Sequence, residues 1–146
     1  MPKLHWRAKS KRYAVRAVID TNILVSALLT PSGVPAQLIA AIRTQALTPV
    51  ISESIIAEYT NVLSRPKFGF ASNRTARLLE DMKGLALFLK PQPIPLQDLP
   101  DPDDAPFIAA ALTADCVIIT GNRKHYPPKT GVEVLSPAEA LSCLSG

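Results

Sequence analysis

Apolar residues follow two different periods along this chain, and the two periods alternate. Short runs that are apolar at nearly every position indicate strands buried on both faces of a parallel sheet. Longer segments with apolar residues three and four positions apart indicate amphipathic helices. The predicted strands are residues 15–19, 49–51, 116–120 and 132–135. The predicted helices are residues 21–29, 34–46, 54–64, 73–89, 101–115 and 137–144.

The alternation of strands and helices predicts the fold class and the domain organisation. We expect an α/β fold, a three-layer α/β/α sandwich with a central parallel sheet of four to five strands. Residues 15–146 should form a single domain, because a chain of this length buries about 70% of its unfolded surface without staples. The prolines within residues 91–100 predict a stiff, extended connector inside that domain.

The positive charge of the chain is concentrated at its N-terminal end. The formal net charge is +4, yet residues 1–16 hold six of the 16 lysines and arginines and no acid. We expect residues 1–14 to be a basic, disordered tail. The alternative is a nucleic-acid contact, in which Trp6 and Tyr13 stack on bases.

Neither export nor membrane insertion is expected. The basic stretch lacks the apolar region of a secretory signal, and no apolar run approaches the roughly 20 residues that span a bilayer. Cys116 and Cys143 each stand in an apolar context, as reduced core cysteines do. Neither His5 nor His125 has a zinc-ligand spacing from them. We expect a soluble, cytoplasmic protein.

One acidic residue stands where an apolar strand changes into a helix. In residues 17–29, AVIDTNILVSALL, Asp20 directly follows the predicted strand. Open α/β sheets bind ligands at the carboxyl ends of their strands, which favours a place in a functional site. Alternatively, Asp20, Thr21 or Asn22 caps the next helix, because all three side-chain types accept hydrogen bonds from free helix N–H groups. Both interpretations fit this stretch taken alone.

Two further acids belong to the same edge of the predicted sheet. Glu58 lies on or beside the apolar stripe of its helix, where an unpaired charge is costly. The alternative for Glu58 is a boundary position from which the side chain reaches water. Asp104 belongs to a cluster of acids, larger than helix capping needs, at a helix start. We expect Asp20, Glu58 and Asp104 to converge on one cleft beside residues 120–122.

Acids that converge without matching lysines or arginines indicate a metal site. Their mutual repulsion needs a cation, and an all-oxygen site suits Mg²⁺ or Mn²⁺. Such an ion activates a bound water, which points to hydrolysis of a phosphodiester. The sequence has no P-loop, no dinucleotide-binding glycines and no G-x-S-x-G nucleophile elbow. Asn22 also stands where a D-x-D phosphoaspartate enzyme needs its second acid.

Four motifs in order cover residues 15 to about 140. They are V-I-D-T-N-I-L-V-S-A, S-x-x-x-x-x-E, D-P-D-D-A-P-F-I-x-A-A and I-I-T-G-N-x-K-H-Y. This order and spacing resemble the PIN-domain family, in particular PIN toxins of the VapC type. The resemblance implies a PIN-like fold and an endoribonuclease that uses Mg²⁺ or Mn²⁺ to hydrolyse RNA. It further implies a homodimer and a small antitoxin protein that holds the toxin inactive.

The resemblance also assigns residues to roles. It implies that Asp20, Glu58 and Asp104 bind the metal and carry catalysis. It implies a supporting role for Asn22, which would orient the first aspartate, and for Thr120, which precedes the last part of the site.

The chain departs from the family pattern at the fourth acid. Asn122 and His125 occupy the two positions at which family members place an aspartate. Asn122 coordinates only through a neutral carbonyl, whereas His125 favours softer metals and can act as a base. One of them completes the metal site, or His125 is an ordinary loop residue. The missing acid also leaves open a catalytically silent PIN domain that acts as an RNA- or protein-binding module.

Overall fold

The computed structural model describes residues 15–93 and 99–145. Within these ranges five strands form one sheet, in the order β3-β2-β1-β4-β5, and every neighbouring pair is parallel. The strands are β1 (Val15–Ile19), β2 (Leu47–Ile51), β3 (Leu87–Phe88), β4 (Val117–Ile119) and β5 (Val134–Leu135). The predicted tail, residues 1–14, and part of the proline-rich connector lie outside the described residues.

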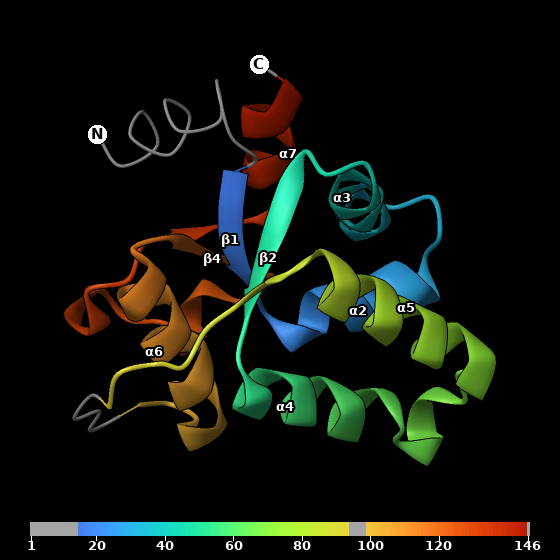
Figure 1. Cartoon of the computed structure of the whole chain (residues 1–146), viewed down its shortest axis with the longest axis horizontal. Coiled ribbons are helices and arrows are strands. Elements are labelled where there is room, and N and C mark those ends of the chain that lie inside the picture. The colour runs from blue at the N-terminus through green and yellow to red at the C-terminus, as the bar shows by residue number, and fades with distance from the viewer. Residues whose placement is uncertain (1–14, 94–98, 146) are drawn as a thin grey trace.

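Helices cover both faces of this sheet. α6 contacts β1, β2 and β4 on one face, whereas α3 contacts β2 from the other face and packs against α2 and α7 (Figure 1). The α-helices of the described residues are α2 (Thr21–Leu29), α3 (Val34–Arg43), α4 (Glu53–Leu63), α5 (Ser72–Leu85), α6 (Ala105–Ala114) and α7 (Pro137–Ser145). The predicted fold class, a three-layer α/β/α sandwich around a parallel sheet, is confirmed.

The core lies on both sides of the central strands. Val18 and Ile19 of β1, Ile51 of β2 and Ile118 of β4 are all 0% exposed, as continuous apolar strands require when helices cover both faces. Burying one such side chain stabilises the fold by about 1.5–3 kcal/mol. The sheet is therefore a rigid platform for the residues that follow its strands.

The predicted helix over residues 73–89 is wrong at its C-terminal end. α5 stops at Leu85, and Leu87 and Phe88 form the edge strand β3. Two adjacent apolar residues fit either period, and pairing with β2 decides between them, because Val50 and Ile51 are the register partners of β3. The Leu89 N–H also donates to the Ile51 carbonyl over 3.0 Å.

The predicted helix over residues 34–46 is likewise too long. α3 ends at Arg43, and Gln45 adopts a left-handed backbone with φ of 67°. This reversal lets the chain enter β2 two residues later, at Leu47, which is 0% exposed.

Serine side chains cap the starts of two helices. The Ile55 N–H donates to the Ser52 hydroxyl over 3.3 Å at the start of α4. At α7, the Glu139 N–H donates to the Ser136 hydroxyl over 3.1 Å, and the Ser136 N–H donates to the Glu139 carboxylate over 2.9 Å. These bonds satisfy donors that a helix start otherwise leaves free.

No single helix in residues 15–93 and 99–145 is long and apolar enough to cross a membrane. By length and composition α2 and α3 pass together, but the chain bends by 106° between them.

The register of the sheet determines which polar residues meet at its carboxyl edge. Ile19 of β1 pairs with Ile119 of β4, so the residues that follow these strands, Asp20 and Thr120, lie side by side. The Asp20 N–H extends the pairing by donating to the Ile119 carbonyl over 2.9 Å. Two positions a hundred residues apart are thereby joined by the central strand pair.

Candidate active site

Asp20 occupies the N-cap position of α2, but its side chain does not cap the helix. Its Oδ2 atom instead accepts a hydrogen bond of 2.7 Å from the Thr120 hydroxyl and one of 3.4 Å from the Asn22 amide. Asp20 as a whole residue is 6% exposed. Of the two interpretations of this stretch, the structure therefore disfavours capping, and neither Thr21 nor Asn22 takes the N-cap position.

Thr120 and Asn22 link the two chain segments that flank Asp20. The Thr120 hydroxyl, 1% exposed as a residue, also accepts from the Asn122 N–H over 3.0 Å. The Asn22 amide oxygen accepts from the Gly121 N–H over 3.3 Å. The first turn of α2 and the turn after β4 are thus tied together, which holds the Asp20 carboxylate in one orientation. Thr120 and Asn22 thus both contact Asp20, the residue that the sequence analysis expected them to support.

Glu58 projects from the second turn of α4 and is partly exposed. Its pKa is raised above the ordinary value, first by burial and then by the negative charge of Asp103, while Arg65 opposes the shift. α4 is held against the site by Tyr59, whose hydroxyl donates to the Ile19 carbonyl over 2.6 Å. Glu58 therefore lies at the edge of the apolar stripe of α4, as the sequence predicted.

Asp104 is the most perturbed carboxylate among the described residues that line this edge. It precedes α6, is 6% exposed, and has its pKa raised to about 7, mainly by burial and secondly by Asp20, with His125 lowering it. His125 Nδ1 lies 3.3 Å from Asp104 Oδ2, yet this oxygen makes no aligned hydrogen bond in the described residues. An oxygen buried in this way is poised to accept a proton or a cation.

These acids share one cleft of about 320 Å³. It is lined by Asp20, Thr21, Asn22, Val25, Glu58, Val62, Arg65, Phe68, Asp101, Asp103, Asp104, Phe107 and His125. The carboxylates come from the end of β1, from α4 and from the start of α6. The structure thus brings Asp20, Glu58 and Asp104 to one cleft, as the sequence predicted.

Asn122 and His125 separate in the structure. His125 lines the cleft beside Asp104, whereas the Asn122 amide oxygen accepts from the Lys124 N–H over 3.3 Å and starts a short 3-10 turn, Arg123–His125. Asn122 is not one of the residues lining the cleft. Of the two candidates for the fourth position, His125 is the one whose side chain faces the acids.

Three residues near the cleft were not singled out from the sequence. Arg65 and Phe68 line the cleft from the segment after α4. Tyr126 is 3% exposed, and burial together with the charge of Asp20 raises its pKa well above the ordinary value. The signal for Tyr126 was its place as the last residue of the fourth motif. Arg65 and Phe68 gave no signal, because they read as a helix end and a loop.

The donor set of the cleft fits a hard divalent cation. In residues 15–93 and 99–145 no group of three or more His, Cys, Asp or Glu side chains is close enough to enclose an ion. Mg²⁺ needs no such cage, since it usually binds one or two carboxylates and keeps several waters. The Asp104 Oδ2 atom, which accepts no hydrogen bond in the described residues, and the excess of carboxylates over cations in the lining match that chemistry.

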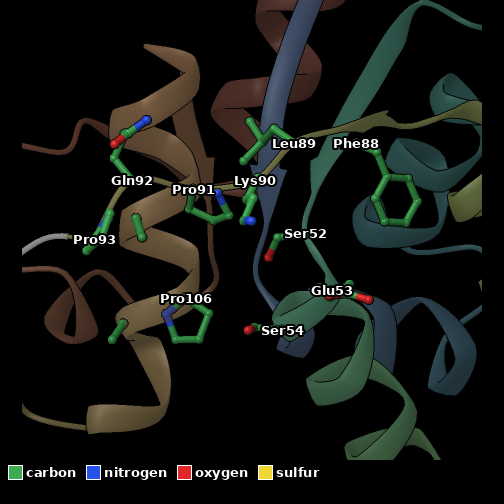
Figure 2. A pocket seen from close by; sticks show the side chains of 12 residues that line it. Ser52, Glu53, Ser54, Phe88, Leu89, Lys90, Pro91, Gln92, Pro93 and Pro106 are labelled. Carbon is green, nitrogen blue, oxygen red and sulfur yellow. The ribbon is translucent and has the colours of Figure 1, made fainter.

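A second, larger groove of about 790 Å³ also borders α4 and α6. Figure 2 shows its lining by the start of α4, the chain after β3 and Pro106 of α6. It holds one carboxylate, Glu53, and one ammonium, Lys90. Because no acids converge there, the smaller cleft is the candidate active site.

Fold and cleft together define an α/β domain that gathers carboxylates at the carboxyl edge of a parallel sheet. Residues 16–124 match the PIN domain family, and the chain belongs to that family. It is 28% identical over 118 residues to the uncharacterized protein MJ1680 of Methanocaldococcus jannaschii, across 79% of this chain and 76% of that protein. The structure of VapBC-1 from nontypeable Haemophilus influenzae is similar in fold, with a TM-score of 0.56 and 19% identity over 84% of this chain and 98% of that one. The family predicted from the four motifs is confirmed.

Proposed function

We propose that this protein is a metal-dependent endoribonuclease in which Asp20, Glu58 and Asp104 hold Mg²⁺ or Mn²⁺. The observation that carries the proposal is Asp104, a 6% exposed carboxylate whose Oδ2 atom lacks a hydrogen-bond partner among the described residues. Keeping such a group charged is unfavourable unless a cation lies beside it. Membership of the PIN-domain family supports a nuclease, and RNA as the substrate follows from the resemblance to VapC-type toxins.

The residues of the cleft divide the work between binding and proton transfer. When bound, the ion lowers the pKa of a coordinated water and offsets the charge that develops on the phosphate. Thr120 holds the Asp20 carboxylate through its 2.7 Å hydrogen bond, so the carboxylate need not reorganise during the reaction. His125 lines the cleft 3.3 Å from Asp104, so its imidazole is the group placed to accept a proton from the cleft.

Cleavage of single-stranded RNA tests the proposal. A panel of RNA oligonucleotides is incubated with Mn²⁺, with and without a chelator, beside DNA oligonucleotides of the same sequences. We expect cleavage of RNA with Mn²⁺ and none with the chelator. Equal cleavage with and without the chelator would show that the reaction needs no metal. Cleavage of DNA but not of RNA would show that the substrate is DNA.

We further propose that the protein is the toxin of a toxin–antitoxin pair, that it acts in the cytoplasm, and that it forms a homodimer. Support comes from the family, from the four motifs and from the similarity in fold to VapBC-1. Light scattering of the purified chain measures the oligomeric state. Slowed growth on expression, relieved by Asp20→Asn, is the expected sign of a toxin.

Replacing Thr120 tests whether its hydroxyl positions Asp20. Thr120→Val keeps the shape but removes the donor, so we expect Mn²⁺ affinity and RNA cleavage to fall by about 10- to 100-fold. Thr120→Ser keeps the donor and should stay close to wild type in both measurements. Metal affinity is followed by calorimetric titration. Wild-type behaviour of Thr120→Val would show that Asp20 needs no such support.

The second candidate function is a catalytically silent PIN domain that binds RNA or protein. The observation that favours it is the Asn122 amide, which accepts from the Lys124 N–H and adds no fourth acid to the cleft. This function needs no metal, so the two candidates differ in their response to Mn²⁺.

Mn²⁺ is expected to raise the Tm of the wild-type protein by several degrees. An ion that binds only the folded state stabilises it by about 2.7 kcal/mol at a concentration of a hundred times Kd. The Tm is measured by circular dichroism with increasing Mn²⁺, and Asp20→Asn should abolish most of the rise. A wild-type Tm that does not respond to Mn²⁺ would favour the silent binding module.

A further inference from the structure

An aromatic side chain lines the acidic cleft from the segment between α4 and α5. Phe68, the last residue of the 3-10 turn Pro66–Phe68, is half-buried and faces the same cleft as Glu58 and Asp104. It stacks on Phe70, with ring centroids 5.3 Å apart and ring planes 10° apart. Phe70 packs against the core, whereas Phe68 does not, so Phe70 supports Phe68 from behind. A ring held in this way at the edge of a polar cleft can stack against a ligand with a flat face.

The backbone keeps Phe68 in place without a ligand. The Phe68 N–H donates to the Arg65 carbonyl and the Gly69 N–H donates to the Pro66 carbonyl, each over 3.1 Å. Arg65 is extended, as a residue before proline prefers, and Gly69 takes a left-handed conformation with φ of 61°. The turn is therefore pre-organised, and binding at Phe68 orders little additional chain.

Positive charge flanks the ring, while the rest of the cleft is acidic. The Lys67 ammonium lies 5.1 Å from the centroid of the Phe68 ring. Arg65 lines the cleft on the same segment, and its charge acts on Glu58. A flat apolar face next to two cations, with metal-binding acids beyond them, matches a nucleotide: a base for the ring and phosphates for the cations.

We propose that Phe68 is a stacking platform for one base of a single-stranded RNA, next to the phosphate that lies among Asp20, Glu58 and Asp104. Arg65 and Lys67 then contact the backbone phosphates on either side of that base. Lys67 is exposed and leaves the ring for a phosphate when the base arrives, because a nucleobase stacks on an exposed ring more strongly than an ammonium does. The strand must be single, since only an unpaired base offers its face. This inference rests on the proposed function.

Three variants separate stacking from structural support. Phe68→Leu keeps an apolar side chain but removes the aromatic face, whereas Phe68→Tyr keeps both. The matched control is Phe88→Leu, because Phe88 is an aromatic residue, 49% exposed, that lines the other groove (Figure 2). The Tm of each variant is measured first, and a fall common to Phe68→Leu and Phe68→Tyr would mark a structural role.

The probe is a short fluorescein-labelled oligouridine that carries one fluorescent purine analogue, bound in Ca²⁺ to slow cleavage. Anisotropy reports affinity, and quenching of the purine analogue reports stacking. We expect Phe68→Leu to lose about tenfold in affinity and most of the quenching, and Phe68→Tyr and Phe88→Leu to behave as wild type. Removing that one base from the RNA should weaken binding to the wild type but not to Phe68→Leu.

Two measurements keep this inference apart from the proposed function. Wild-type RNA cleavage with unchanged binding by Phe68→Leu overturns the stacking platform alone. RNA binding and quenching that depend on Phe68, without any cleavage, overturn the nuclease and leave the platform standing. Loss of binding in Phe88→Leu but not in Phe68→Leu places the RNA in the other groove and also overturns the inference, as does an RNA that fails to bind at all.

Discussion

Asp20→Asn is expected to lower RNA cleavage by about a thousandfold, because a metal ion contributes several kcal/mol to the transition state. The substitution keeps the size of the side chain and retains an oxygen that can accept from Thr120. The variant should therefore fold as the wild type does, with one negative charge fewer in the cleft. Initial rates of cleavage with saturating Mn²⁺ measure the effect, and circular dichroism verifies the fold.

The matched control for this variant is Asp115→Asn. Asp115 is an exposed residue at the C-terminal end of α6, and its φ of 52° is a left-handed conformation that asparagine tolerates well. The same chemical change away from the cleft should leave cleavage within about twofold of wild type. If Asp20→Asn and Asp115→Asn both cleave at the wild-type rate, Asp20 does not hold a catalytic ion.

Asp104→Asn is expected to stabilise the metal-free protein at alkaline pH. Burial and neighbouring carboxylates raise the pKa of Asp104 from 3.8 to about 7, so ionising this group in the folded state is unfavourable. At about 1.4 kcal/mol for each pKa unit, the wild type loses up to about 4 kcal/mol of stability by keeping this carboxylate charged. Asparagine stays neutral at every pH, so the buried charge and its repulsion with Asp20 are both absent.

The sign of the pH dependence follows from proton binding. Between pH 3.8 and about 7 the folded state holds a proton on Asp104 that the unfolded state has already released. The free energy of unfolding of the wild type therefore falls as pH rises through this window, and the loss is complete above it. Asp104→Asn should lack this fall, so the two stability curves diverge as pH increases.

Urea unfolding in a chelator, repeated across that pH window, measures the effect. Asp115→Asn is again the control, because it makes the same chemical change at an exposed position outside the cleft. Adding Mn²⁺ should reverse the order of stability, since the wild type gains from the ion and Asp104→Asn gains little. Parallel pH profiles for wild type and Asp104→Asn would mean that the surroundings of Asp104 do not raise its pKa.

Both predictions concern two buried, neighbouring carboxylates that destabilise the metal-free protein. Asp20 and Asp104 are each 6% exposed and lie close enough for Asp20 to raise the pKa of Asp104. Such a pair lowers the stability of the protein alone and raises its affinity for a cation. Under the proposed function, the stability that Asp104→Asn gains is the stability that the wild type gives up for metal binding.

The periodicity of the sequence was enough to determine the layers, and the motifs were enough to determine the family. Val15–Ile19 is apolar at every position except Arg16 because helices cover both faces of the sheet, and that pattern is local and visible without a structure. The position of Asp20 at the end of this strand could be read in the same way. Glu58 and Asp104 could be assigned through their spacing within the motifs.

Tertiary structure decided what short apolar segments and turns do. Leu87 and Phe88 fit a helix by period and form a strand because the edge of β2 accepts their backbone. The strand order places β1 beside β4, which brings Thr120 to Asp20 across a separation of 100 residues. No local pattern encodes that contact, because it arises from pairing between distant strands.

The turn after β4 and the segment after α4 show the same limit within the site. Asn122 and His125 were equal candidates by sequence position, and a 3-10 turn directs one to a backbone N–H and the other toward Asp104. Phe68 looked like an ordinary loop residue and lines the cleft only because α4 ends beside it. The sequence by itself determined the fold and the family and pointed to the acids that share the cleft, since these depend on local periods and spacings. Only the packed structure decided which neighbours complete the cleft, since that depends on contacts between segments far apart in the chain.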